Sequence, residues 1–95
     1  MLLSTYTFDG DPETLLACHR KMMDLFPPDA LDLHLAVTTD AGLTVFDSCP
    51  DVATHTAFVV SPEFLGTLER VGLPEPRIEI LGEVHFATMN QSVIR

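Results

Sequence analysis

Positively charged residues are scarce in this sequence. Five Lys and Arg residues stand against 14 Asp and Glu residues, which gives a formal net charge of −9 at pH 7. The five are scattered along the chain, so no basic stripe is present that would neutralise a phosphate backbone or an anionic lipid surface. We therefore predict no nucleic-acid partner and no membrane partner, and we interpret the acidity as a solubilising surface.

Long apolar runs and cysteine-rich motifs are missing as well. No apolar stretch reaches the roughly 20 residues that a membrane helix needs, and Met1 is not followed by the segments of a secretory signal, so we predict a cytoplasmic protein. Cys18 and Cys49 lack the close spacing of a zinc or redox motif, so we expect buried, reduced thiols and no metal site. A glycine-rich phosphate loop and a G-x-S-x-G elbow are also absent, so nucleotide and serine-hydrolase chemistry have no support and we predict no cofactor.

The composition that is present is that of a small globular domain. Hydrophobic residues make up 46% of the 95 residues and charged residues 20%, which differs clearly from disordered chains. This length predicts one domain over residues 1–95. A chain so short buries only about 60 to 65% of its unfolded surface, so its core is marginal and a second subunit would extend it. We expect a homodimer.

The first part of the chain predicts a strand and then a helix. Leu2 to Phe8 is rich in β-branched and aromatic residues, as strands are. Asp11 is placed to cap a helix, and Pro12 suits its first position. Pro27-Pro28 should end this helix. Its apolar residues recur at helical spacing: Leu15, Cys18, Met22 and either Leu25 or Phe26.

Residues 31–48 predict a β-hairpin. Leu31, Leu33, Leu35 and Val37 alternate with more polar residues, which is the pattern of a half-covered strand. We expect a three-residue loop over residues 40–42 with Gly42 left-handed, which places Val37 opposite Val45 and the aliphatic side chains on one face. The opposite face would then carry His34, Ala36 and Thr38 from one strand and Thr44, Phe46 and Ser48 from the next.

Two short helices and a last strand complete the predicted order. A helix should begin near Asp51 and break at Ser61-Pro62, because proline ends a helix but suits a new first turn capped by serine. Gly72 should end the second piece. The last strand is expected over Arg77 to Phe86, and the chain from Met89 is expected to be a tail.

The order βαββαβ predicts an α+β, ferredoxin-like fold, in which helices cover one face of a four-stranded antiparallel sheet. The other face is then bare. Phe46 and Leu81 on that face are best explained by a second sheet that packs against them, although solvent exposure is an alternative.

At this point the chain resembles the dimeric α/β-barrel superfamily, small ferredoxin-like proteins whose two sheets face each other and enclose a cleft. The best local match is Ala57-Phe58-Val59-Val60-Ser61-Pro62-Glu63-Phe64. It is similar to the second-helix segment of the antibiotic-biosynthesis monooxygenase branch, where a small residue and a His precede a Ser/Thr-Pro-x-Phe turn. The resemblance implies a dimeric α/β barrel.

Several departures from that branch bear on activity. A Trp commonly follows its third strand and a His lies four residues before the proline, but Cys49 and Phe58 stand in those places here. The chain has no Trp, and its only Asn is Asn90. Members that oxidise polycyclic phenols without a cofactor, or degrade haem, are understood to use Asn, Trp and His side chains in the cleft. Those roles are therefore not carried over.

His34 and Tyr6 are the candidate catalytic residues. A neutral imidazole is the usual acid or base near neutral pH, and a tyrosine on a central strand can donate a hydrogen bond to a substrate oxygen. The strand does not reveal which face Tyr6 takes, and an ordinary buried tyrosine is the alternative. In a face-to-face dimer His34 would approach Glu83 or His85 of the partner subunit, and a polar interface histidine is the alternative there.

The leading hypothesis is a homodimer that holds a small apolar or aromatic molecule in the cleft between sheet and helices. One alternative is a cofactor-independent monooxygenase or isomerase acting on an aromatic or polyketide-like compound, and another is a structural or interaction module with a filled cleft. His19 and His55 have polar neighbours on the predicted helices, so we expect them to be solvated. The predicted ligand contacts are Phe46, Thr44, Phe58, Phe64, Leu81 and His85.

Overall fold

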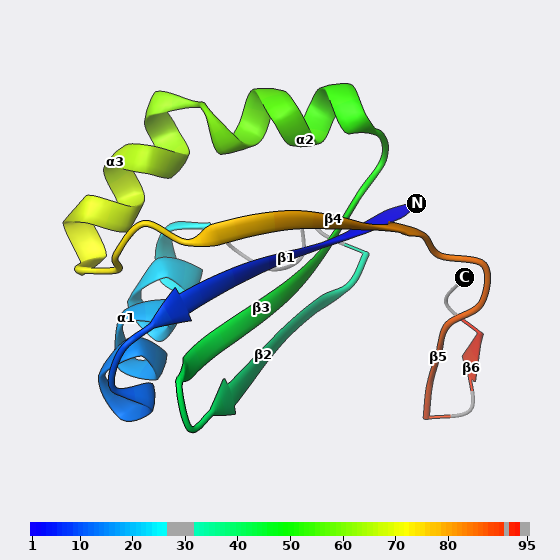
Figure 1. Ribbon diagram of the computed structural model, residues 1–95. Coiled ribbons are helices and arrows are strands. Elements are labelled where there is room, and N and C mark those ends of the chain that lie inside the picture. Colours follow the sequence, from blue (N-terminus) through cyan, green and yellow to red (C-terminus); the bar gives the residue numbers. More distant parts are fainter. Residues whose placement is uncertain (27–31, 91, 94–95) are drawn as a thin grey trace.

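The computed structural model describes residues 1–26, 32–90 and 92–93. Within these residues four antiparallel strands form a sheet in the order β2-β3-β1-β4, accompanied by three helices (Figure 1). The strand order and the helix count fit a ferredoxin-like α+β fold. The elements are β1 (Leu2–Asp9), α1 (Pro12–Leu25), β2 (His34–Thr39), β3 (Gly42–Cys49), α2 (Val52–Val59), α3 (Pro62–Val71), β4 (Arg77–Glu83), β5 (Thr88–Met89) and β6 (Ser92–Val93).

All three helices begin where the sequence predicts. The side chains of Asp11, Asp51 and Ser61 each accept a hydrogen bond from the backbone N–H three residues further on, which satisfies one of the free donors of the first turn. The break at Ser61 between α2 and α3 is therefore confirmed. The predictions for Pro27, Pro28 and Leu31 lie outside the described residues.

The end of α3 at Gly72 is also confirmed. Gly72 takes the left-handed conformation, with φ of 84°. Its N–H donates to the carbonyl of Glu69, and the N–H of Leu73 donates to the carbonyl of Leu68 at 2.9 Å. This pair of bonds is the usual helix ending that a glycine permits, because glycine has no Cβ to clash in this conformation.

The register of the β2–β3 hairpin differs from the prediction. Its loop has two residues, and Thr39 pairs with Gly42, so Val37 lies opposite Thr44 instead of Val45. Side chains alternate across a strand, so a shift of one residue exchanges the two faces. The predicted face assignment is therefore wrong: His34, Ala36 and Thr38 share a face with Leu43, Val45 and Asp47.

The cause of this register is the close approach of Gly42 to β1. Gly42 pairs with Asp9 as the first residue of β3, and its φ is +156°. A Cβ at this position would lie 2.0 Å from the backbone oxygen of Phe8. Gly42 is thus needed inside the strand pair, and this leaves only Asp40 and Ala41 for the loop.

The core lies between the helices and one face of the sheet. Helix α1 packs over β2 and β3, and α2 lies over β3. The buried residues of this core are Tyr6, Phe8, Leu15, Met22, Leu43, Val45, Phe64, Leu68, Val71 and Leu73.

The opposite face, which we call the bare face, is partly apolar. It carries Leu35 and Val37 from β2, Phe46 from β3 and Leu81 from β4. Leu35 and Val37 are each 44% exposed, and Leu81 is 52% exposed. No helix of the described chain covers them.

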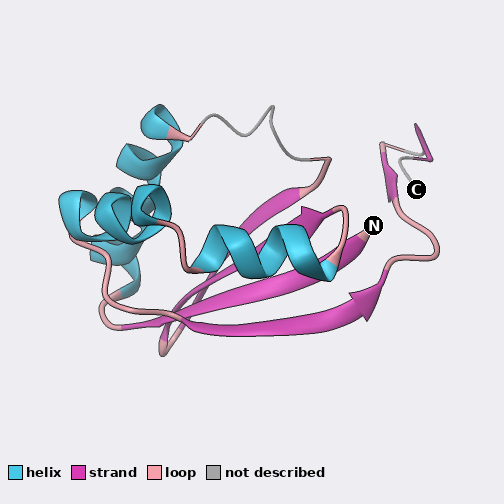
Figure 2. Cartoon of the chain, turned by 90° about the horizontal axis from the view of Figure 1, so that it is seen from above, coloured by secondary structure: helices cyan, strands magenta, loops and turns pink. Residues whose placement is uncertain are grey.

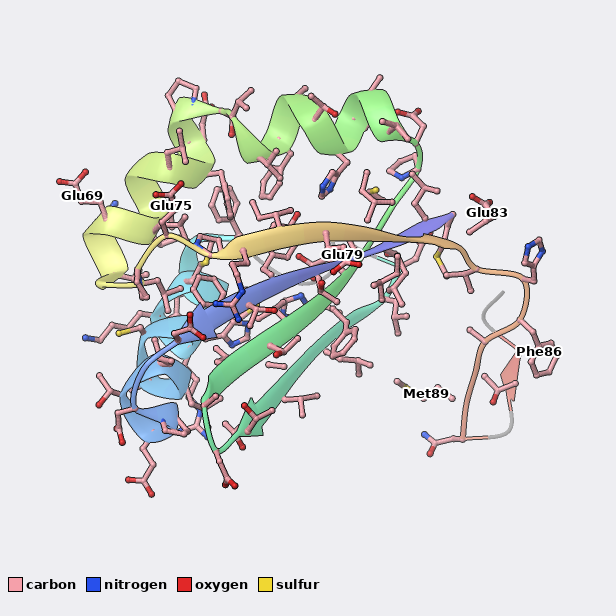
Figure 3. The ribbon with its side chains drawn as sticks, in the orientation of Figure 1. Glu69, Glu75, Glu79, Glu83, Phe86 and Met89 are labelled. Carbon is pink, nitrogen blue, oxygen red and sulfur yellow. The ribbon has the colours of Figure 1, made fainter. Side chains whose placement is uncertain are left out.

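The C-terminal region also departs from the prediction. Strand β4 ends at Glu83 instead of continuing to Phe86, and the predicted tail contains two short paired strands, β5 and β6. This pair lies apart from the four-stranded sheet (Figure 2). Phe86 and Met89 belong to this segment and are 74% and 53% exposed (Figure 3).

Across the described residues, every helix is too short or too polar to cross a bilayer.

Candidate functional site

A pocket of about 370 Å³ lies between the helix-covered face of the sheet and helices α1 and α2. This volume falls within the range of small-molecule sites, which are mostly apolar with a few convergent polar groups. The apolar lining comes from all the surrounding elements: Phe8, Met22, Met23, Phe26, Val45 and Phe58, together with Pro50. The polar lining consists of Tyr6, His19, His34, Asp47, Ser48, Cys49, Thr54 and His55.

Three of the polar residues form a chain of side-chain hydrogen bonds. His34 begins β2 and lies directly opposite Asp47 on β3, and the Nδ1 of His34 is hydrogen-bonded to the Oδ1 of Asp47. The Nε2 of His34 lies 3.0 Å from the Nε2 of His19, which α1 supplies from above the sheet. The two imidazole rings are nearly parallel, with 6° between their planes. We call this chain the Asp47–His34–His19 relay.

The partners of each nitrogen determine where the protons lie in the neutral relay. A carboxylate only accepts hydrogen bonds, so His34 donates to Asp47 through Nδ1 and presents a lone pair at Nε2. His19 must then donate through its own Nε2. The Nδ1 of His19 keeps its lone pair and is the free basic nitrogen at the end of the relay.

The electrostatic surroundings of His19 favour its neutral form. Its side chain is buried, and burial is the main cause that lowers its pKa below 6.5. The neighbouring His34 lowers this pKa further, while the carboxylate of Asp47 acts in the opposite direction. His19 is therefore an uncharged base at neutral pH.

Tyr6 and Cys49 are both held in their protonated forms. Burial raises the pKa of Tyr6 to about 12; a hydrogen bond with Ser4 opposes this shift, and the charge of Asp47 adds to it. Burial likewise raises the pKa of the Cys49 thiol, with further contributions from Asp51 and Asp47. Tyr6 is thus a hydrogen-bond donor at neutral pH, and Cys49 is poorly suited to act as a thiolate nucleophile.

His55 is a buried histidine without a hydrogen-bond partner among the described residues. It is 6% exposed, and its ring lies 6.1 Å from the ring of Tyr6. Among the described residues, every side-chain nitrogen or oxygen that is fully buried has a hydrogen-bond partner, so a nitrogen without a partner must keep some accessible surface. The ring nitrogens of His55 and the Nδ1 of His19 therefore keep accessible surface, and both residues line the pocket.

The structure brings together some of the predicted site residues and separates others. His34, Tyr6 and Phe58 line the pocket. Phe64 lies behind it in the core, with its ring 4.7 Å from that of Phe58. Phe46, Thr44 and Leu81 lie on the bare face, and His85 is exposed beyond the end of β4.

Two of the sequence-based statements about histidines are wrong. His34 does not lie on the bare face, so the basis for its expected approach to Glu83 or His85 of the partner subunit is lost. His19 and His55 are not solvated, because both are buried against the sheet. The spacing of His19 in the sequence does indicate burial, because His19 lies four residues after Leu15 and three before Met22, on the same side of the helix.

Asp47 was missed altogether. The feature that marks Asp47 as a site residue is its position opposite His34, because a carboxylate and an imidazole form a complementary cross-strand pair. This feature can be recognised only once the register of the hairpin is known.

Among the described residues, no three His, Cys, Asp or Glu side chains are arranged to hold a metal ion.

Comparisons with protein-family models, with curated proteins and with solved structures gave no match to this chain.

Proposed function

We propose that this protein binds a small, largely apolar molecule that carries a hydrogen-bonding group, in the pocket between the sheet and helices α1 and α2. The observation that carries the proposal is the combination of an apolar lining with unpaired polar atoms. Burying a polar group without a partner is costly, so such atoms in a pocket mark places that a ligand satisfies. The ring nitrogens of His55 and the Nδ1 of His19 have no hydrogen-bond partner among the described residues but keep accessible surface, and both residues line the pocket, so a ligand that fills it would have to satisfy them.

The test uses α-naphthol, an aromatic phenol whose fluorescence responds to its surroundings, titrated against the purified protein. Thr54 and Thr56 provide a matched pair of variants, because both are exposed residues of α2 but only Thr54 lines the pocket. We expect Thr54→Trp to weaken binding by about tenfold or more, because the indole occupies the pocket, and Thr56→Trp to leave binding unchanged. Absence of saturable binding, or equal binding by both variants, would overturn the proposal.

We further propose that the chain forms a homodimer through the bare face, in the arrangement of a dimeric α/β barrel. The support is the exposure of Leu35, Val37 and Leu81, which together with Phe46 place apolar side chains on three strands of one uncovered surface. Soluble chains seldom leave such a surface open to water. A second copy of the same face would cover it symmetrically.

Sedimentation velocity tests this arrangement. We expect a dimer at micromolar concentration and a monomer for Val37→Glu, which places a charge in the interface. Thr38→Glu is the control, because Thr38 is also exposed but faces the helix-covered side. A monomeric wild-type protein, or a dimer that tolerates Val37→Glu, would contradict the proposal.

A further inference from the structure

The geometry points to an enzymatic activity at this pocket: the Asp47–His34–His19 relay moves a proton to and from a carbon atom next to a ketone carbonyl of the bound molecule. The inference rests on the proposed binding function and adds the reaction and the substrate class to it. The reaction is the interconversion of keto and enol forms, or the shift of a double bond conjugated with the ketone.

The relay has the order that a general base requires. A base needs a free lone pair within reach of the ligand and a group behind it that accepts the resulting charge. The Nδ1 of His19 is the free lone pair, and the His34 Nε2 lies 3.0 Å from the His19 Nε2. Behind His34 stands Asp47, bonded to the opposite nitrogen of the ring. His19 is therefore the catalytic residue, and His34 and Asp47 are positioning residues.

The proton transfer balances without any co-reactant. The C–H bond of the ligand breaks, its electron pair becomes the carbon–carbon double bond of the enolate, and the carbonyl pair moves to oxygen. His19 takes the proton at Nδ1 and passes its Nε2 proton to the Nε2 of His34. The positive charge then lies on His34, beside the carboxylate of Asp47. Return of a proton to the oxygen or to another carbon restores the relay and releases the isomer.

The remaining polar groups of the pocket fit a neutral ketone. An anionic ligand would be repelled by Asp47, whereas a ketone becomes negative only as the proton leaves. Tyr6, protonated and in the same pocket, is a donor for the developing charge on oxygen, which is the usual means of stabilising an enolate. The buried His55 beside Tyr6 supplies a second polar contact. The apolar walls accept the hydrocarbon part of the ligand.

The groups that influence the protonation of the relay come from several elements. His34 on β2 and Asp47 on β3 act on His19 directly. Tyr6 on β1, Cys49 on β3 and His55 on α2 line the same pocket. The pH dependence of the reaction therefore reports the relay as a coupled unit.

The experiment measures the exchange of the acidic hydrogens of β-tetralone for deuterium in heavy water, followed by proton NMR. Binding of β-tetralone is measured separately, by displacement of α-naphthol. We expect the wild-type protein to accelerate exchange over buffer and His19→Gln to lose about 100-fold or more of that acceleration. His85→Gln is the control, because His85 is exposed and lies outside the pocket, and it should exchange like the wild type.

Asp47→Asn gives a readout that a merely structural role would not produce. Without the negative charge beside His34, the relay holds a proton less tightly, so the midpoint of the pH–rate profile should move to lower pH. Nitrogen NMR of the wild-type protein tests the relay even if the variants fail to fold. It should show His34 protonated at Nδ1 and bare at Nε2.

Each failure has a distinct signature. Binding of β-tetralone without accelerated exchange overturns the relay and leaves the binding proposal standing, whereas absence of saturable α-naphthol binding overturns both. Acceleration that survives His19→Gln, or that a chelator abolishes, also overturns the inference.

Discussion

Replacement of Gly42 by alanine tests the reason for the hairpin register on which the site depends. The added Cβ would lie 2.0 Å from the backbone oxygen of Phe8 and 3.1 Å from its carbonyl carbon. Cβ atoms essentially never come within 3.0 Å of another atom, so β1 and β3 would have to separate by about 1 Å. Both contacts are with backbone atoms, so no side-chain rotation relieves them.

Two costs combine in this variant. A residue other than glycine at a φ of +156° costs about 1 to 3 kcal/mol. The forced separation of two packed strands costs a further ~1 to 3 kcal/mol. Against a free energy of unfolding of about 5 to 15 kcal/mol for a domain, this is a large share of the total. Since 1 kcal/mol lowers Tm by about 4 to 8 °C in a chain of this size, we expect a decrease of about 10 °C or more.

Thermal and urea unfolding, followed by circular dichroism, measure this effect. Gly66→Ala is the matched control, because Gly66 lies in α3 with nothing within 4 Å of an added Cβ. Alanine is the better helix former by about 1 kcal/mol, so this control should be slightly stabilised. If Gly42→Ala unfolds within about 0.5 kcal/mol of the wild type, the close approach of Gly42 to Phe8 does not determine the register.

Two further predictions concern titration. Burial lowers the pKa of His19 in the folded protein, so the unfolded chain binds more protons, and the free energy of unfolding should fall as pH drops from 6.5 toward the lowered pKa. Denaturant titrations across this range should show that loss in the wild type and a smaller loss in His19→Gln. An equal dependence on pH in both proteins would contradict the prediction. The second prediction uses the fact that Tyr6 is the only tyrosine of a chain without Trp, so its phenolate absorbance is read without interference. The midpoint of an alkaline spectrophotometric titration should lie near pH 12, and a midpoint near 10 would show that Tyr6 is not buried as described.

The sequence by itself determined the local structure of this protein. The caps at Asp11, Asp51 and Ser61 and the end of α3 at Gly72 all depend on groups within a few residues of one another, so local patterns suffice to predict them. The order of strands and helices followed from the same patterns. The four-stranded antiparallel sheet was also predicted correctly, because the βαββαβ order permits few arrangements.

Only the tertiary structure decided which side chains meet in the pocket. The face that His34 takes depends on the register of the hairpin, and that register depends on the contact of Gly42 with Phe8, more than 30 residues away in the chain. A shift of a single residue carried His34 from the bare face to the side of Asp47 and His19. The burial of His19 and His55 likewise depends on how α1 and α2 lie over the sheet, and their polar sequence neighbours did not reveal it. The site is thus a product of long-range pairing, which residue type and local spacing do not determine.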